Sequence, residues 1–156
     1  MRCSVGHVWL VLGVFILLAS QPASAALTDD EINLMIASGE MRQLEPFIGT
    51  LLYVEAPDQA YEHDPFTIIV VSQVNTTLAS ADTVLIDLLK NDTPVMMTDA
   101  YSVNENQGSG MTVQEWQLHG ELDVSYRVQV QLGDQQRSYP ILIAFTKKTI
   151  VDTLTE

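Results

Sequence analysis

Apolar and polar positions alternate along most of the chain after residue 47, which is the pattern of β-strands that bury one face. Short polar turn segments separate the alternating stretches. They predict strands over residues 50–55, 66–74, 83–89, 95–98, 111–118, 125–132 and 139–145. A change of phase between Val113 and Trp116 predicts a β-bulge near Gln114 and Glu115. Pro140 has no amide donor, so the last strand is expected at the edge of a sheet.

One stretch near the start of the chain follows helical spacing instead. Apolar residues recur three and four positions apart from Ile32 onward, and Gly39 is a typical helix stop. Before them, Thr28 and Glu31 have the spacing of a capping box, in which each side chain binds the backbone amide of the other residue. The pattern predicts a short amphipathic helix over residues 28–38.

The first 25 residues have the pattern of an export signal. Arg2 supplies the positive start, and an unbroken apolar run follows over residues 8–19. This run is shorter than the ~20 residues that a membrane-spanning helix needs. Ala23-Ser24-Ala25 then offers small residues at both positions that a signal peptidase recognises, so cleavage is expected before Ala26. An uncleaved N-terminal anchor is the alternative.

The chain therefore divides into four predicted parts. They are a cleaved signal peptide (1–25), an N-terminal helical segment (26–46), a β-sandwich domain (47–146) and a C-terminal tail (147–156). Secretion or a periplasmic location follows from the signal, with no stable membrane anchor after cleavage.

Cysteine content and charge exclude several functions. The only cysteine, Cys3, leaves with the signal, so disulfides, thiolate catalysis, cysteine-ligated zinc and blue-copper sites are ruled out in the mature chain. The full chain carries a net charge of -13, and the mature chain, with 6 basic and 20 acidic residues, carries -14. Such a chain repels phosphate backbones, so no nucleic-acid partner is expected.

Seven short strands at this spacing predict a mainly β fold, a two-sheet antiparallel sandwich preceded by one short amphipathic helix. The segment 122–128 resembles the corner and F strand of immunoglobulin-like and fibronectin-III-like domains, with Tyr126 in the place of the corner tyrosine. Val128 stands where antibody domains have their second bridging cysteine, and the C-strand tryptophan of those domains has no counterpart here. The resemblance implies an immunoglobulin-like architecture; a lipocalin-like barrel is the alternative.

Few residues suggest catalysis or metal binding. His63 and His119 lie several strands apart, and none of the common hydrolase or nucleotide-binding motifs is present, so a non-catalytic protein without a cofactor is expected. Two metal sites are the alternatives: a set of soft copper ligands and a calcium-binding loop. Their residues are Met96, Met97, Met111, His63 and His119 for copper, and the loop 104–110 for calcium. Asn75 is a glycan acceptor if the secretory route is eukaryotic.

An apolar second sheet face supplies the candidate partner site. Its predicted residues are Ile69, Val71, Leu85, Leu89 and Leu142. Either the N-terminal helix or another protein must cover that face. The first hypothesis is an exported, non-catalytic protein-binding module, acting as an accessory subunit or a chaperone-like factor of a periplasmic or cell-surface assembly. Its partner is then another extracytoplasmic protein or a second copy of the chain.

The predicted architecture is loosely similar to the small periplasmic sandwich proteins that restrain curli subunits, which implies a chaperone role. The second hypothesis is a secreted β-sandwich that binds a small ligand or metal ion. A hydrolase whose site is assembled by folding is the third.

Overall fold

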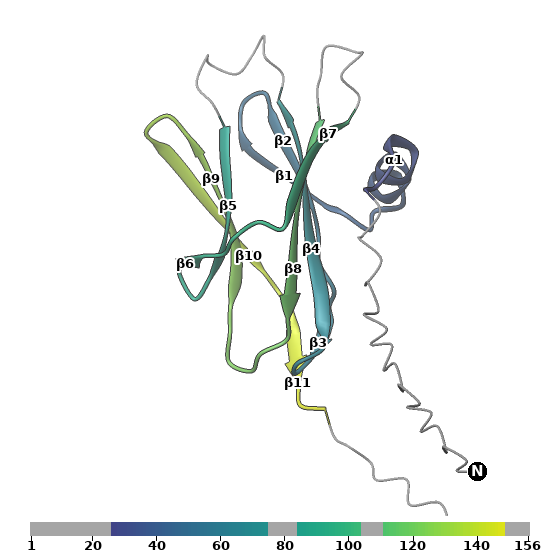
Figure 1. Ribbon diagram of the computed structural model, residues 1–156. Helices are drawn as coiled ribbons and strands as arrows, with labels where there is room; N and C mark the ends of the chain where they lie inside the picture. Colours follow the sequence, from purple (N-terminus) through teal and green to yellow (C-terminus); the bar gives the residue numbers. More distant parts are fainter. Residues whose placement is uncertain (1–25, 75–83, 104–110, 149–156) are drawn as a thin grey trace, which may run out of the picture.

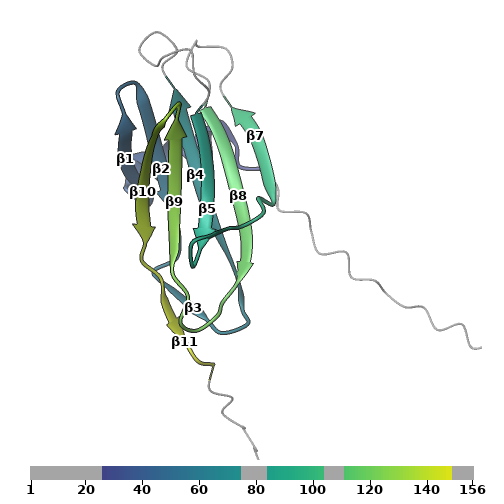
Figure 2. The ribbon, with the colours of Figure 1, turned by 90° about the vertical axis from the view of Figure 1, so that its left-hand side faces the viewer.

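Two antiparallel sheets face each other, and one short helix lies against the outer side of the larger sheet (Figures 1 and 2). The computed structural model describes residues 26–74, 84–103 and 111–148. The larger sheet has the order β1 (Arg42–Phe47), β2 (Thr50–Glu55), β4 (Pro65–Val74), β8 (Met111–His119) and β7 (Asp99–Val103). The smaller has the order β10 (Gln135–Ile141), β9 (Tyr126–Leu132), β5 (Val84–Lys90) and β6 (Thr93–Pro94).

This arrangement confirms the predicted β-sandwich. The order β2-β4-β8-β7 against β10-β9-β5-β6 is that of the A-B-E-D and G-F-C-C′ sheets of immunoglobulin-like sandwiches. A third pair, β3 (Gln59–Tyr61) and β11 (Ala144–Thr146), runs parallel at the lower end of the molecule. Tyr126 begins β9, the counterpart of the F strand, as the resemblance implied. The core tryptophan comes from β8 as Trp116.

The helix α1 (Asp29–Ser38) forms as its capping signals predict. The Thr28 hydroxyl accepts from the Glu31 amide at 3.4 Å, while the Glu31 carboxylate accepts from the Thr28 amide at 2.8 Å. Gly39 ends the helix with a φ of +79°, which glycine adopts without strain. Ile32 is fully buried, and it packs on the outer face of the larger sheet with Met41, Val71, Met111 and Val113.

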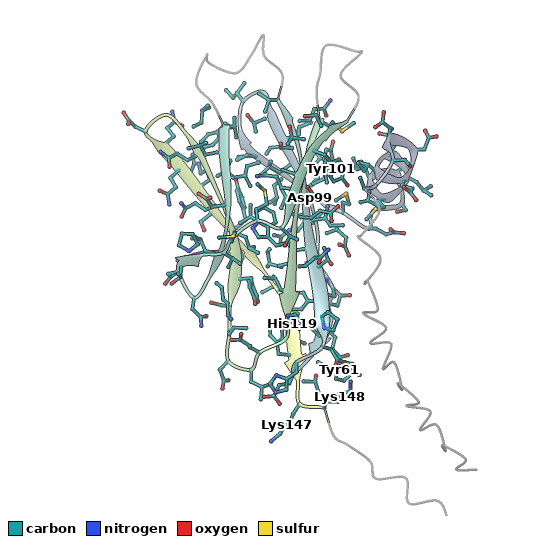
Figure 3. The ribbon with its side chains drawn as sticks, in the orientation of Figure 1. Tyr61, Asp99, Tyr101, His119, Lys147 and Lys148 are labelled. Atoms are coloured by element: carbon teal, nitrogen blue, oxygen red, sulfur yellow. The ribbon has the colours of Figure 1, made fainter. Side chains whose placement is uncertain are left out.

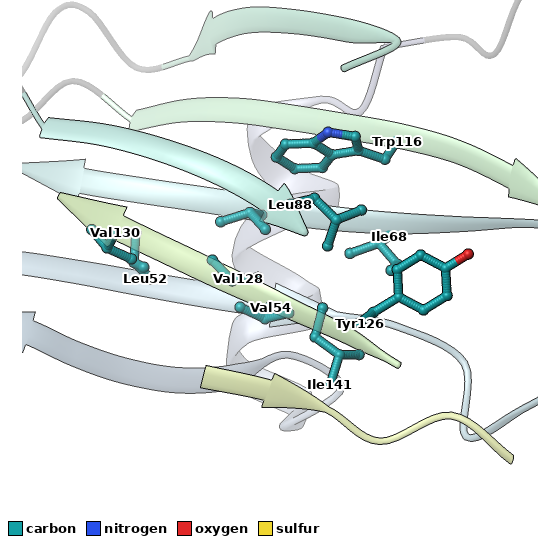
Figure 4. Close-up of a cluster of buried hydrophobic side chains, with 10 residues drawn as sticks. Leu52, Val54, Ile68, Leu88, Trp116, Tyr126, Val128, Val130 and Ile141 are labelled. Carbon is teal, nitrogen blue, oxygen red and sulfur yellow. The ribbon is translucent and has the colours of Figure 1, made fainter. Parts of the chain in front are cut away.

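The main core lies between the two sheets (Figure 4). Alternation along each strand explains it: on β4, Ile68 and Val70 point inward, while Ile69 and Val71 point toward α1. The buried members of this core are Leu52, Val54, Ile68, Val70, Leu88, Trp116, Tyr126, Val128, Val130 and Ile141.

Two strand predictions are wrong, and one strand was not predicted. The unpredicted strand is β1, which begins at Arg42; it is a largely exposed edge strand whose polar residues hide its alternation. Residues 95–98 form no strand, and the neighbouring strand β7 starts at Asp99. The strand predicted over 139–145 is divided, since β10 ends at Ile141 and β11 begins at Ala144. As predicted, the part with Pro140 is a sheet edge.

The predicted bulge near Gln114 and Glu115 is also absent. The pairing of β4 with β8 is continuous from Pro65 opposite His119 to Gln73 opposite Met111. The apolar side of β8 changes instead, because α1 covers the outer face at Val113 while Trp116 enters the core between the sheets. A regular strand that buries one face over part of its length and the other face over the rest therefore has the same sequence pattern as a strand with a bulge.

Candidate functional site

The candidate site arises where the chain leaves the smaller sheet after the two residues of β6. A tight turn joins β5 to β6, with positive φ angles at Asn91 and Asp92 of 46° and 66°. The indole Nε1–H of Trp116 then donates to the Val95 carbonyl at 3.2 Å. Three residues later, the Thr98 amide donates to the Glu115 carbonyl at 2.8 Å. These two hydrogen bonds to β8 hold residues 95–98 where the chain crosses from the smaller sheet to the larger one.

Among the described residues, this crossing leaves the upper part of β5 without a partner strand on one side. The last hydrogen bond there runs from the Val95 amide to the Leu88 carbonyl at 2.8 Å. Backbone groups alternate along a strand, so those of Val84 and Ile86 point to the same side as Leu88. Over residues 26–74, 84–103 and 111–148, no strand pairs with that side above Leu88.

A cleft of about 440 Å³ lies between the sheets beside this edge. Its lining combines apolar and polar side chains from three strands. They are Ser72 and Val74 of β4, Val84, Leu85, Ile86 and Asp87 of β5, and Thr112 and Gln114 of β8. The site is therefore an unpaired backbone edge with a partly polar cleft next to it, and we call the two together the β5 edge.

The other exposed sheet edges carry features that hinder strand pairing. On β1, Pro46 lacks an amide and the register shifts between Leu44 and Phe47. On β10, Pro140 lacks an amide too, and its carbonyl already accepts from the Arg42 guanidinium at 2.8 Å.

On strand β7, a hydrogen bond between neighbouring residues hinders pairing with an added strand. The amide of Ala100 donates to the carboxylate of its neighbour Asp99 at 2.8 Å, so it is not free to pair with another strand. Among the long outer strands that the structure describes, the upper part of β5 carries no such feature.

The five residues predicted to bind a partner do not form one surface. Val71 is fully buried and Ile69 half-buried beneath α1, so the helix covers the apolar face that the sequence left open. Leu89 is buried within the smaller sheet. Leu85 is 53% exposed and lines the cleft at the β5 edge. Leu142 is 81% exposed but lies across the sandwich, in a depression with Arg42 and Val54.

His119 lies at the lower end of the molecule (Figure 3), and the His63 amide donates to the carbonyl of the next residue, Gly120, at 2.8 Å. The His63 side chain is largely exposed, and the carboxylate of Asp64 binds the Lys148 ammonium at 2.8 Å. His119 ends β8 opposite Pro65. In this part of the molecule, the lysine rather than a histidine is the partner of Asp64.

The candidate metal ligands are spread over the molecule. Met96 is 90% exposed, the Met97 sulfur accepts from Gln114 at 3.3 Å, and Met111 is buried beneath α1. Within the described ranges, no three His, Cys, Asp or Glu side chains group as metal ligands would. The predicted calcium loop 104–110 and Asn75 lie outside the described residues.

Two further findings bear on function. No family model matches the chain, and comparison with curated proteins found no similar sequence. In the part of the chain that the structure describes, no helix has the length and apolar character to span a bilayer.

Proposed function

We propose that the protein is an exported, non-catalytic protein-binding module that takes up an extended segment of another protein at the β5 edge. The observation that carries this proposal is the backbone of Val84 and Ile86 beside an inter-sheet cleft, with which no strand of the described residues pairs on that side. An added strand would satisfy those amides and carbonyls, and its alternate side chains would enter the cleft. A chaperone or an accessory subunit of a periplasmic or cell-surface assembly works in this way.

The cleft supports a particular kind of segment. Val74, Val84 and Ile86 favour small apolar side chains, whereas Ser72, Thr112 and Gln114 supply hydroxyl and amide groups for polar ones. We infer a partner strand that places small apolar and hydroxyl side chains alternately toward the cleft. Since the whole chain carries -13, a neutral or basic segment is favoured over an acidic one.

Two exposed leucines provide a matched cross-linking test. The predicted mature chain contains no cysteine, so Leu85→Cys and Leu142→Cys each introduce a single thiol that can carry a photo-cross-linker. Leu85 lies at the β5 edge, and Leu142 lies across the sandwich. With the labelled proteins in extracts of the producing cell, we expect one partner to cross-link through the first position and not through the second.

Backbone pairing is tested by Val84→Pro against Val84→Thr. Proline removes the outward amide at the first residue of β5, where a strand tolerates it, while threonine keeps the amide and the β-branched shape. Loss of edge hydrogen bonds should weaken binding about tenfold or more in the proline variant alone.

Equal cross-linking through both cysteines, or equal binding by both Val84 variants, would refute strand addition at this edge. A purified protein that carries a small molecule in the cleft and captures no protein would instead favour the ligand-binding hypothesis, because the cleft has the size of a small-molecule site.

A further inference from the structure

Two acidic residues occupy opposite positions on neighbouring strands at the outer side of the larger sheet, next to the start of α1. Asp99 of β7 and Glu115 of β8 are direct cross-strand neighbours. Like charges at such opposite positions destabilise the sheet. Glu115 is only 4% exposed, and a buried carboxylate needs a compensating partner. The ion pairs formed among the described residues use other carboxylates, namely those of Glu62, Asp64, Asp92 and Glu121.

Tyr101 connects this acidic pair to the N-terminal segment. Its hydroxyl donates to the Glu115 carboxylate at 2.9 Å and accepts from the Leu27 amide at 2.8 Å. Figure 3 shows Asp99 and Tyr101 near each other on the side of the sheet that α1 covers. Burial, together with the neighbouring carboxylates, raises the pKa of Tyr101 to about 12, so the hydroxyl keeps its proton near neutral pH.

The residue before Leu27 is the predicted new N-terminus. Adjacent backbone nitrogens are at most about 3.7 Å apart, so the Ala26 nitrogen lies within about 6.5 Å of the Tyr101 hydroxyl oxygen. In the precursor this nitrogen belongs to an uncharged peptide bond. Hydrolysis of the bond between Ala25 and Ala26 consumes one water, leaves a carboxylate on Ala25, and frees an amine on Ala26 that takes up a proton.

We propose that Asp99, Tyr101 and Glu115 form a binding site for the α-ammonium group of Ala26, which removal of the signal peptide creates. The ammonium supplies a cation to the acidic pair, which forms no ion pair among the described residues. Leu27 holds the terminus there, because its amide binds Tyr101 and its side chain packs against the cluster of buried residues beneath α1. Processing thus strengthens the attachment of α1 to the sheet.

The groups around the site all favour a cation. They are Asp99 and Tyr101 of β7, Glu115 of β8, Glu55 of β2 in the same cross-strand row, and Asp29, Asp30 and Glu31 in the first turn of α1. A nearby negative charge stabilises the protonated amine, so the pKa of the Ala26 amine should exceed the ordinary range of about 7.7–8.0. The added stability is then complete below that range and is lost as the pH rises through the raised pKa.

The test compares the exported, processed protein with a variant that carries Gly-Ser between Ala26 and Leu27. This insertion keeps the cleavage sequence but moves the ammonium two residues away. Mass spectrometry identifies the new N-terminus, and NMR titration of labelled alanine gives the pKa of the amine. We expect a raised pKa in the natural protein, an ordinary one in the insertion variant, and a Tm about 2–4 °C lower for the variant at pH 7.

Glu115→Gln should remove the difference between the two proteins, whereas Glu45→Gln, at an exposed position on β1, should leave it unchanged. If Glu115→Gln does not fold, the comparison of the natural protein with the insertion variant still decides. An equal amine pKa in the two proteins, an equal Tm, or a new N-terminus other than Ala26 would overturn the proposal. None of these outcomes depends on strand addition at the β5 edge.

Discussion

At the scale of single residues, the lower end of the sandwich depends on a glycine that has no room for a side chain. Gly120 donates its amide to the Asp64 carbonyl at 2.9 Å and accepts from the His63 amide at 2.8 Å. A Cβ at this position would collide with the backbone carbonyl of Tyr61. We expect Gly120→Ala to lower the free energy of unfolding by about 2–3 kcal/mol, measured by urea denaturation.

Gly39 is the matched control for this prediction. It has a positive φ of +79° but open space around it, with no atom within 4 Å of an added Cβ. Gly39→Ala should therefore cost only the strain of a left-handed backbone, about 1 kcal/mol. Equal losses for the two substitutions would show that the close approach to Tyr61 does not determine the role of Gly120.

At the scale of elements, α1 is attached to the sheet through one side. Ile32 is fully buried in the contact, while Leu34, two residues later, is 68% exposed. Ile32→Ala should lower the free energy of unfolding by about 3 kcal/mol, and Leu34→Ala should change it by no more than about 0.5 kcal/mol. The fluorescence of Trp116, the only tryptophan among the described residues, reports the transition. Similar effects of the two substitutions would contradict the observed contact.

The elements also show what sequence alone can predict. Helix α1, β4 and β9 were predicted because their signals are local: a capping box, a β-branched run and strict alternation. The path of residues 95–98 was not, because it depends on the indole of Trp116, which is 21 residues from its acceptor Val95. Alternation assigns a residue to one face of a strand but does not say what covers that face.

The same limit explains why the sequence did not predict the candidate site. Hydrophobicity grouped Leu85 with Val71, although one lines the cleft and the other lies beneath the helix. The β5 edge has no sequence signal of its own, since an unpaired backbone results from the short length of β6 and the crossing that follows it. Leu85, which is exposed, is the one residue of this edge that the sequence predicts to bind a partner, and that prediction depends on its apolar character alone.

At the scale of the whole molecule, the two open sides of the sandwich differ in the contacts that connect one sheet to the other. One side is bridged where the Arg42 guanidinium of β1 reaches the Pro140 carbonyl of β10. The lower end is closed by three aromatic rings, Phe66, Tyr126 and Phe145, with centroids 5.8 to 6.1 Å apart. The remaining side, at upper β5, has neither feature among the described residues, which is why a partner strand is proposed there.

Net charge is the other property of the whole molecule, and a chain with -13 is destabilised by its own repulsion. At Glu55 burial has the larger effect and repulsion adds to it: partial burial, and secondly the nearby Glu40, raise the pKa of its carboxyl above the ordinary 4.5. The folded protein thus binds this proton more tightly than the unfolded chain, and the contribution of Glu55 to stability is lost as the pH rises through the raised pKa. At pH 7 the negative charge of Glu55 therefore lowers the stability of the fold.

Glu55→Gln should raise the Tm at pH 7 by about 1–3 °C, a gain that disappears below pH 4.5. Glu45→Gln on exposed β1 is the control, and a gain independent of pH would disprove the electrostatic cause.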